Sequence, residues 1–238
     1  MTIPGPYAPD VSAAAEPSRA YADGVSDLAD IAALLADRTR ARILEELLGG
    51  TALPAGALSV RVGVAPSTIS GHLAKLEAAG LITVRSVGRR REASLARPEV
   101  AEALEALGRL STADARPIGL RAVNGHAALR EARSCYDHLA GRAGVALADH
   151  LVEAGALSVV DGAFAVAEPG FFLSEYGIDI AGLSRRRAVV RSCMDWTERR
   201  PHVAGALGAA LLDVFLARGW VARRPSDRAL NLSAAFPV

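Results

Sequence analysis

The 238-residue sequence contains only two cysteines, a single lysine and no long uninterrupted apolar run. Two cysteines cannot build the disulfide framework of a small secreted protein. A membrane span needs about 20 consecutive apolar residues, and here an arginine, aspartate or glutamate interrupts every long run. Residues 1–24 lack the basic start and the apolar stretch of a signal peptide. These absences predict a cytoplasmic protein that makes no membrane contact.

The charge and the motif content exclude further classes of protein. The chain has 27 basic and 26 acidic residues, so its net charge of +1 does not identify a partner. It contains no glycine-rich phosphate loop, no Gly-x-Ser-x-Gly and no His-Glu-x-x-His. We therefore predict that the protein is not an enzyme. The length is sufficient for two small domains, each with its own core.

Composition and apolar spacing divide the chain into four parts. Residues 1–24, with four prolines and few apolar side chains, are predicted to form a disordered tail. The next part, 25–111, combines helical periodicity with one hairpin and is followed by a predicted linker over 112–125. Residues 126–238 are predicted to form a second, mostly helical domain. The fold class is therefore mainly α (α+β).

The elements expected in the first domain follow from apolar spacing and from glycine and proline positions. Helices are predicted at 28–35, 37–48, 55–62, 66–79 and 99–110, and strands at 81–86 and 92–95. A helix, a glycine and a hairpin occur in this order around 72–95, and again at 150–166 and at 212–232. One interpretation of this weak repeat is a second winged-helix-like unit in the C-terminal domain.

A local basic segment predicts DNA binding. Residues 61–97 hold seven basic and only two acidic residues, and clustered cations neutralise phosphates. The helix at 66–79 follows a turn at Gly63, which is the arrangement of a helix-turn-helix whose second helix enters the major groove. The expected DNA contacts are Pro66, Ser67, Thr68, Ser70, Gly71, His72, Lys75, Arg89, Arg90 and Arg91. Taken singly, these serines and threonines are ordinary capping residues and the arginines a solvated turn, but their combined spacing favours DNA.

Three motifs in this order resemble the ArsR/SmtB family of bacterial repressors. They are residues 33–44 (ALLADRTRARIL), residues 67–82 (STISGHLAKLEAAGLI) and residues 88–91 (GRRR). The resemblance covers about residues 25–110. It implies a winged helix-turn-helix domain that binds a pseudo-palindromic operator in double-stranded DNA as a homodimer, with the helix at 28–35 and the helix at 99–110 at the dimer interface.

The familiar metal sites of that family are missing from the first domain. Residues 58–62 (LSVRV) contain no thiol where metal-sensing members carry a Cys-x-Cys type motif, and residues 99–110 contain no histidine. An effector, whether a metal ion or a small molecule, is therefore expected to act on the C-terminal domain.

Both cysteines lie in that domain, each followed by a histidine. Cys135 and His138 would share one face if their segment is helical, and Cys193 precedes His202 by nine residues. Two thiolates and two imidazoles form a suitable set for Zn²⁺ or another thiophilic ion. Two alternatives stay open: cysteines that are simply part of the core, and a redox pair that forms a disulfide or a sulfenic acid.

A second candidate site in this domain is a pocket for an anionic organic ligand. Trp196, Arg199 and Arg200 lie close to His202 in the sequence and offer a ring and two cations. The alternative is a helix end at Pro201 with two solvated arginines.

Together these features predict a homodimeric transcriptional repressor whose C-terminal domain, residues 126–238, serves effector sensing or dimer support. The alternative function is a metal- or small-ligand-binding protein whose winged-helix fold mediates protein contacts rather than DNA binding.

Overall fold

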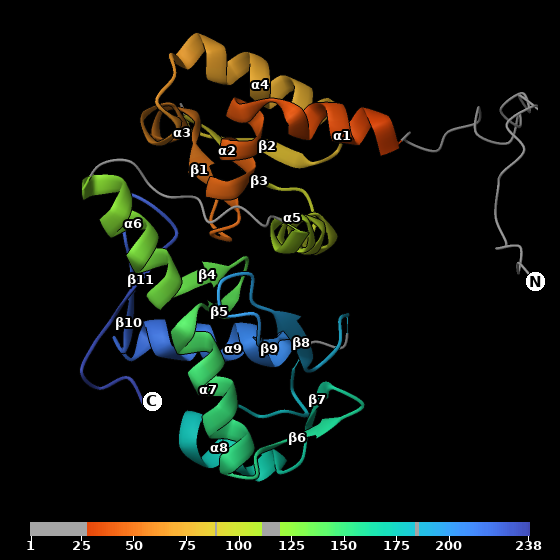
Figure 1. Ribbon diagram of the computed structural model, residues 1–238, viewed down its shortest axis with the longest axis vertical. Coiled ribbons are helices and arrows are strands. Elements are labelled where there is room, and N and C mark those ends of the chain that lie inside the picture. Colours follow the sequence, from red (N-terminus) through yellow and green to blue (C-terminus); the bar gives the residue numbers. More distant parts are fainter. Residues whose placement is uncertain (1–27, 89, 111–119, 184–185) are drawn as a thin grey trace, which may run out of the picture.

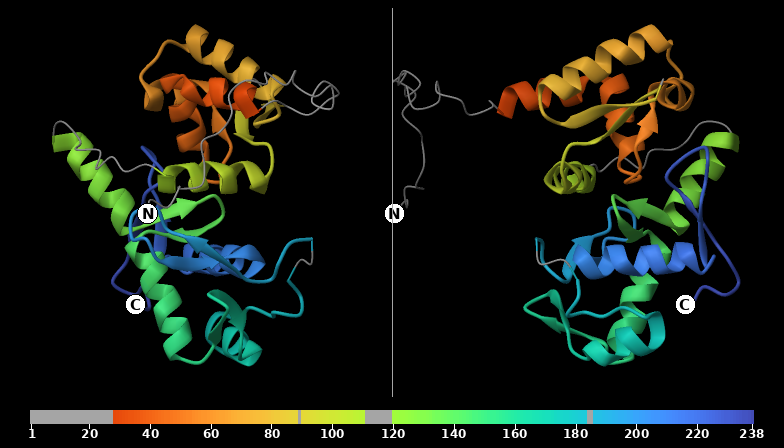
Figure 2. Two further views of the ribbon diagram at one scale, coloured as in Figure 1. Left: turned by 45° about the vertical axis from the view of Figure 1, so that its right-hand side comes forward. Right: turned by 180° about the vertical axis from the view of Figure 1, so that it is seen from behind.

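The computed structural model describes residues 28–88, 90–110, 120–183 and 186–238. The chain forms two lobes stacked along the long axis, each with a separate hydrophobic core (Figure 1). We call residues 28–110 the winged-helix lobe and residues 120–238 the C-terminal lobe. Helix α5 (Pro98–Leu110) lies between them in every view (Figures 1 and 2). No helix in the described part of the chain combines the length and apolarity needed to cross a membrane.

The winged-helix lobe contains the helices and the hairpin predicted from its sequence. Its elements before α5 are α1 (Leu28–Ala36), α2 (Arg38–Leu47), β1 (Leu53–Pro54), α3 (Ala55–Val62), α4 (Pro66–Ala78), β2 (Ile82–Val87) and β3 (Arg90–Leu95). The strands form an antiparallel sheet in the order β1-β3-β2. The two-residue strand β1 was not predicted, because it is too short to show periodicity. The predicted mainly α winged helix-turn-helix fold is confirmed.

Local signals set the helix boundaries in this lobe. The Asp37 side chain accepts a hydrogen bond of 2.9 Å from the Arg40 amide and caps α2. Gly63 adopts a left-handed φ of 78° at the end of α3, and Pro66 begins α4. The side chains of Ile43 and Ile69 are fully buried and help to fix α4 against α2.

The C-terminal lobe begins with α6 (Leu120–Glu131) and then contains two copies of one unit, a hairpin followed by a helix and a second hairpin. The first copy is β4 (Arg133–Cys135), β5 (His138–Ala140), α7 (Arg142–Glu153), β6 (Leu157–Val160) and β7 (Ala163–Val166). After α8 (Pro169–Tyr176), the second copy is β8 (Arg191–Met194), β9 (Pro201–Ala204), α9 (Gly205–Ala217), β10 (Val221–Arg223) and β11 (Leu230–Leu232).

The two copies match in sequence as well as in structure. Residues 138–144 (HLAGRAG) return 64 residues later as 202–208 (HVAGALG). Gly141 and Gly205 have φ values of 80° and 85°, a left-handed conformation that favours glycine. The copies pack reciprocally, since α7 contacts β9 and α9 contacts β5. The lobe is therefore an internal duplication with an approximate two-fold arrangement.

Several expectations need correction at this point. The segment from Cys135 to His138 is a β-hairpin and not a helix. Arg90 and Arg91 lie within β3 rather than in the turn, opposite Val87 and Ser86.

Helix α6 begins at Leu120, so the end of the predicted linker 112–125 is helical. The tail 1–24 and residues 112–119 lie outside the described residues. The helix-hairpin units at 150–166 and 212–232 are present, but their strands pair only within each hairpin.

Replacing Phe215 measures how much the core of the C-terminal lobe contributes to stability. The Phe215 side chain is fully buried and contacts Tyr176, Trp220 and Phe236. Because removing a buried phenylalanine leaves a cavity, we expect Phe215→Ala to lower the free energy of unfolding of this lobe by about 3–5 kcal/mol. Urea unfolding followed by tryptophan fluorescence reports on this lobe, since both tryptophans belong to it.

The control is Leu173→Ala on α8, where the side chain is 57% exposed. It should change the free energy of unfolding by less than about 0.5 kcal/mol. Equal effects of the two substitutions would contradict the core described above.

Candidate nucleic-acid interface and metal centre

Helix α4 presents its N-terminal half to solvent, on the side of the winged-helix lobe that faces away from the C-terminal lobe (Figures 1 and 2). The predicted DNA contacts that are exposed on α4 are Pro66, Ser67, Thr68, Ser70, Gly71 and Lys75. The opposite face, with Ile69, Leu73 and Leu76, is buried in the core. The helix is thus anchored by its apolar side and offers hydroxyl groups, backbone and one cation to a ligand.

Two of the predicted contact residues on α4 are engaged within the protein. The Ser70 hydroxyl donates a hydrogen bond of 3.0 Å to the Pro66 carbonyl oxygen. His72 is half-buried, and its Nδ1 lies 3.7 Å from a carboxylate oxygen of Asp37, the residue that caps α2. His72 therefore packs beside the start of α2, and a DNA contact by His72 stays a prediction.

The wing carries exposed cations next to α4. Arg85 on β2 and Arg90 and Arg91 on β3 are exposed, and Arg91 lies 4.0 Å from Glu77 of α4. Arg89 is outside the described residues. Arg61, which belongs to the same basic segment of the sequence, faces the other lobe instead. Its guanidinium binds Glu46 and the Pro225 carbonyl oxygen.

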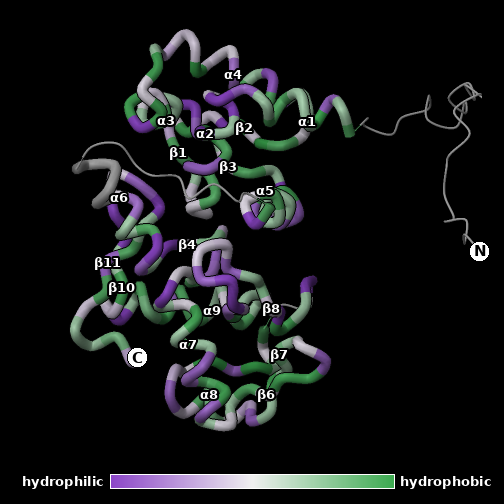
Figure 3. Tube along the Cα trace, viewed as in Figure 1, coloured by the Kyte–Doolittle hydropathy of each residue, from purple (hydrophilic) through white to green (hydrophobic). Residues whose placement is uncertain are grey.

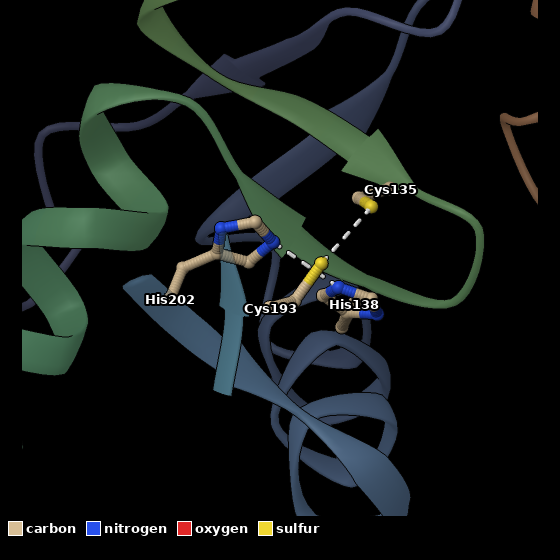
Figure 4. A group of neighbouring side chains, drawn as sticks. All are labelled: Cys135, His138, Cys193 and His202. Atoms are coloured by element: carbon tan, nitrogen blue, oxygen red, sulfur yellow. Dashed lines mark hydrogen bonds between the residues drawn. The ribbon is translucent and has the colours of Figure 1, made fainter. Parts of the chain in front are cut away.

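The four predicted metal ligands meet in the C-terminal lobe (Figure 4). Cys135 lies opposite His138 in the β4–β5 hairpin, and Cys193 lies opposite His202 in the β8–β9 hairpin. One ligand atom from each residue lies within 4.8 Å of the other three. The two Sγ atoms are 4.0 Å apart and the two Nε2 atoms 3.1 Å apart. Each copy of the duplicated unit thus contributes one thiol and one imidazole.

Each histidine turns its other ring nitrogen toward an aspartate, which the sequence analysis missed. His138 Nδ1 is 3.2 Å from Asp137 Oδ1, and His202 Nδ1 is 3.6 Å from Asp195 Oδ2. The repeated Cys-x-Asp at 135–137 and 193–195 was the sequence signal for both. Metal-binding histidines usually donate this second N–H to a carboxylate, which fixes the ring orientation.

Asp195 is fixed in a fully buried network. It accepts hydrogen bonds from the Arg133 guanidinium at 2.9 Å and from the Gly141 amide at 2.7 Å. Burial alone would raise the pKa of Asp195, but the charge of Arg133 and hydrogen bonds from Thr197 and Gly141 hold this pKa well below its usual range. The carboxylate therefore stays ionised beside His202.

The thiols differ in their surroundings. A hydrogen bond from Cys135, together with the two imidazoles, lowers the pKa of Cys193 to about 2 although burial opposes this. The same hydrogen bond, with burial, raises the pKa of Cys135. Burial lowers the pKa of His138, but Asp137 and Cys193 raise this pKa by more than burial lowers it. The net shift of the pKa of His138 is therefore upward. The cluster thus places one thiolate against two imidazoles, and these residue types bind thiophilic cations.

A cavity of about 1010 Å³ leads to this cluster from the space between the lobes. Helix α5 forms one wall with Glu102 and Glu105, and Arg187 and Arg191 line the other side. Cys135, His138 and Cys193 lie on its surface. A small ion from solvent therefore has a route to three of the four ligands.

The three residues of the predicted anion pocket make separate contacts within the protein. The Trp196 ring lies under the Arg133 guanidinium, 4.9 Å from the ring centroid. Arg199 donates to the Arg109 carbonyl oxygen, and Arg200 forms two hydrogen bonds with Asp149. These contacts give each side chain a structural role, and the ligand pocket stays a prediction.

Comparisons with known proteins match both lobes. The helix-turn-helix domain family HTH_20 matches residues 35–85. The HTH-type transcriptional regulator YdfF of Bacillus subtilis (strain 168) is 41% identical over 214 residues, which covers 89% of this chain and 94% of that protein. The chain belongs to the HTH-type transcriptional regulators. The predicted family is thereby confirmed, and this regulator is a DNA-binding protein with a winged helix-turn-helix.

Other relatives match a smaller part of the regulator. CmtR of Mycobacterium tuberculosis (strain ATCC 25618 / H37Rv) is 40% identical over 79 residues, covering 33% of this chain and 66% of that protein. The solved structure of the cadmium metal-sensor CmtR from this organism is 33% identical, with a TM-score of 0.30, and covers 40% of this chain and all (100%) of that one. The homodimeric winged helix-turn-helix domain of Mb0332 from Mycobacterium bovis is 26% identical with a TM-score of 0.32, covering 35% of this chain and 84% of that one.

The two thiols of the metal-free regulator should react at different rates. Cys193 is partly exposed and ionised, whereas Cys135 is buried. Since the thiolate is the nucleophile, we expect iodoacetamide to modify Cys193 at least about tenfold faster than Cys135. Peptide mass spectrometry of samples quenched over time measures both rates.

The pH dependence of this reaction follows from the low pKa of Cys193. Its alkylation rate should fall by less than about threefold from pH 8 to pH 6, because the thiolate persists at both values. An ordinary thiol with a pKa of about 8.5 would slow on the order of 80-fold over this range. Equal rates at Cys135 and Cys193, or an ordinary pH dependence of Cys193, would contradict the described surroundings.

Proposed function

We propose that this regulator is a metal-responsive transcriptional repressor, in which Cys135, His138, Cys193 and His202 bind Zn²⁺ or another thiophilic ion. The observation that carries the proposal is the convergence of these four side chains from two separate hairpins. The two hairpins are far apart in the chain, so these four side chains meet only because the fold packs the hairpins together. A pair of core cysteines would need neither the two imidazoles nor the aspartates beside them.

The thiol–thiol and imidazole–imidazole separations in the cluster fit one tetrahedral ion. With Zn–N of about 2.0–2.1 Å and Zn–S of about 2.3 Å, tetrahedral ligands have nitrogen atoms about 3.3 Å apart and sulfur atoms about 3.8 Å apart. The corresponding separations here are 3.1 Å and 4.0 Å. Asp137, which is hydrogen-bonded to His138, is an outer partner typical of zinc sites, and Asp195 lies 3.6 Å from His202 Nδ1.

The DNA-binding unit of the proposal is a homodimer. Helix α1 is mostly apolar along its length (Figure 3), yet none of its residues is buried within the described chain. Leu107 and Leu110 on α5 are 48% and 76% exposed. Pairing these faces through a two-fold axis would cover them and would place two α4 helices about 34–36 Å apart, one helical turn of DNA. Exposed residues of α4 and the wing then contact a pseudo-palindromic operator.

A thiol switch is the second candidate function of the cluster. The separation of 4.0 Å between Cys135 Sγ and Cys193 Sγ favours it, because a small movement would allow a disulfide. The two functions differ in one measurable property. A disulfide pair needs an oxidant and no histidine, whereas a metal site needs reduced thiols and both imidazoles.

Metal binding is tested on the full chain, purified under reducing conditions without chelator. We expect about one equivalent of zinc per chain by mass spectrometry, and replacement by Co²⁺ should give the absorption spectrum of a tetrahedral thiolate site. Asp137→Asn should weaken zinc binding by about 10–100-fold, because His138 loses an ionised outer partner.

The matched control is Asp149→Asn, on a carboxylate of the same lobe that pairs with the exposed Arg200. It should leave the zinc affinity unchanged. Less than about 0.1 equivalent of zinc, with no uptake on titration, would overturn the metal site and leave the thiol switch.

The wing is tested by the double substitution Arg90→Ala with Arg91→Ala. Each phosphate contact contributes about 0.9 to the slope of log K against log salt, so we expect the slope to fall by about 1.8 and the affinity by about tenfold at moderate salt. Fluorescence anisotropy with a duplex from the region upstream of the protein's own gene measures both. Arg130→Ala with Arg142→Ala, two exposed arginines of the C-terminal lobe, is the control. An unchanged slope in the wing variant would exclude the wing from DNA contact.

A further inference from the structure

The hairpin that holds Cys135 and His138 also contacts the winged-helix lobe. Its two-residue turn, Tyr136 and Asp137, connects the two candidate ligands directly. The Tyr136 amide donates a hydrogen bond of 2.6 Å to the carbonyl oxygen of Leu48, at the C-terminal end of α2. The segment that carries half of the ligand set is thus bonded to a DNA-binding lobe through its backbone.

The fit at this contact is close on both sides. A Cβ added to Gly50 would lie 1.7 Å from the Tyr136 carbonyl oxygen, and the φ of Gly50 is +72°. The Ser134 hydroxyl donates to the Gly49 carbonyl oxygen at 3.2 Å. Tyr136 itself has a φ of 61°, a left-handed conformation that costs a non-glycine residue about 1–3 kcal/mol and persists only when its surroundings hold it.

The Tyr136 side chain continues this contact into the other lobe. It packs against the hydrophobic core formed by α2, α3 and α4, in which Leu47 and Leu48 are buried. Helix α2 contacts both α3 and α4, the two helices of the helix-turn-helix. A displacement of Tyr136 therefore acts on the support of α4 and not only on a surface loop.

We propose that the Tyr136–Asp137 turn transmits metal occupancy of the Cys/His cluster to the DNA-binding helices. The inference rests on the proposed function of this cluster. An ion bound by Cys135 and His138 fixes the separation of the two residues that flank the turn. Without the ion this separation is free to relax, and the turn, Leu48 and the end of α2 move with it.

The other contacts between the lobes are less suited to this role. Arg191 pairs with Glu102 through two exposed side chains, and such surface pairs constrain geometry weakly. Arg228 binds the buried Glu105 at 2.9 Å, but Arg228 lies far in the sequence from all four ligands. Of these three contacts between described residues, only the one made by the Tyr136–Asp137 turn involves a backbone segment that joins two candidate ligands.

The test compares Gly50→Ala with a matched control, Gly155→Ala. Both glycines have a φ of +72°, so alanine brings the same conformational strain. At Gly50 the new Cβ collides with the turn, whereas at Gly155 there is nothing within 4 Å. Zinc content and the dissociation constant for the upstream duplex, with and without Zn²⁺, are measured for the full-length unaltered protein and both variants.

We expect Zn²⁺ to change the dissociation constant at least about fivefold in the unaltered protein and in Gly155→Ala, which is the lower end of usual coupling. In Gly50→Ala the change should shrink to within about twofold, with zinc still bound at one equivalent. A fivefold or larger change that survives in Gly50→Ala would overturn the turn as the coupling element and leave the metal-responsive function standing. No zinc, or bound zinc without effect in the unaltered protein, would overturn the proposed function and this inference together.

A measurement on the unaltered protein covers the case in which Gly50→Ala does not fold. Hydrogen exchange of the Tyr136 amide, which is bonded to Leu48, should change at least about fivefold on addition of Zn²⁺. The Trp220 amide, bonded to Phe215 at the end of α9, serves as the reference and should change by less than twofold. Equal exchange of the Tyr136 amide with and without bound zinc would contradict the proposal.

Discussion

Close approach of backbone to backbone at two glycines is the constraint on which the C-terminal lobe depends. A Cβ at Gly144 would lie 2.6 Å from the Leu139 carbonyl oxygen, and one at Gly208 would lie 2.5 Å from that of Val203. Only glycine allows each helix to start this close to its own hairpin. The same positions face the histidine of the opposite copy, because the nearest side-chain atoms are His202 Cβ and His138 Cβ. The packing that forms the core therefore also brings the two Cys–His pairs together.

The buried charges of this lobe serve position more than stability. Arg133 and Asp195 are both fully buried. The free-energy cost of removing such an ion pair from water offsets much of the attraction between the two charges. Their value lies in fixing the carboxylate beside His202 and the amide of Gly141 at the start of α7. The cluster is thus oriented by residues that do not themselves offer a metal ligand.

The duplication is symmetric in its Cys–His pairs but not in the surroundings of these pairs. The first hairpin has a two-residue turn that contacts α2, whereas the second has six additional residues, 196–201, whose Arg199 reaches α5. The half of the cluster that holds Cys135 and His138 is therefore hydrogen-bonded through its backbone to the DNA-binding lobe, and of the other half only Cys193 lines the cavity between the lobes. The two Cys–His pairs are therefore equivalent in composition, but only the turn between Cys135 and His138 is hydrogen-bonded to the end of α2 among the described residues.

Sequence patterns predicted the winged-helix lobe well because its signals are local. Asp37, Gly63 and Pro66 act within one turn of the helices they begin or end, and the spacing of Ile69, Leu73 and Leu76 defines the buried face of α4. The helical interpretation of Cys135 and His138 was wrong for a definite reason. Residues three apart share a helix face, but they also face each other across a two-residue hairpin turn, and the spacing alone does not distinguish the two.

By itself, the sequence determined the family, the helix-turn-helix and the four residues, two cysteines and two histidines, that suit a thiophilic ion. Only the tertiary structure decided that Cys135, His138, Cys193 and His202 converge, that Asp137 and Asp195 stand behind the histidines, and that Tyr136 contacts α2. The physical reason is the distance along the chain over which each interaction acts. Capping and periodicity act over a few residues, whereas the cluster joins strands about 60 residues apart, whose meeting depends on how two helix–hairpin units pack against each other.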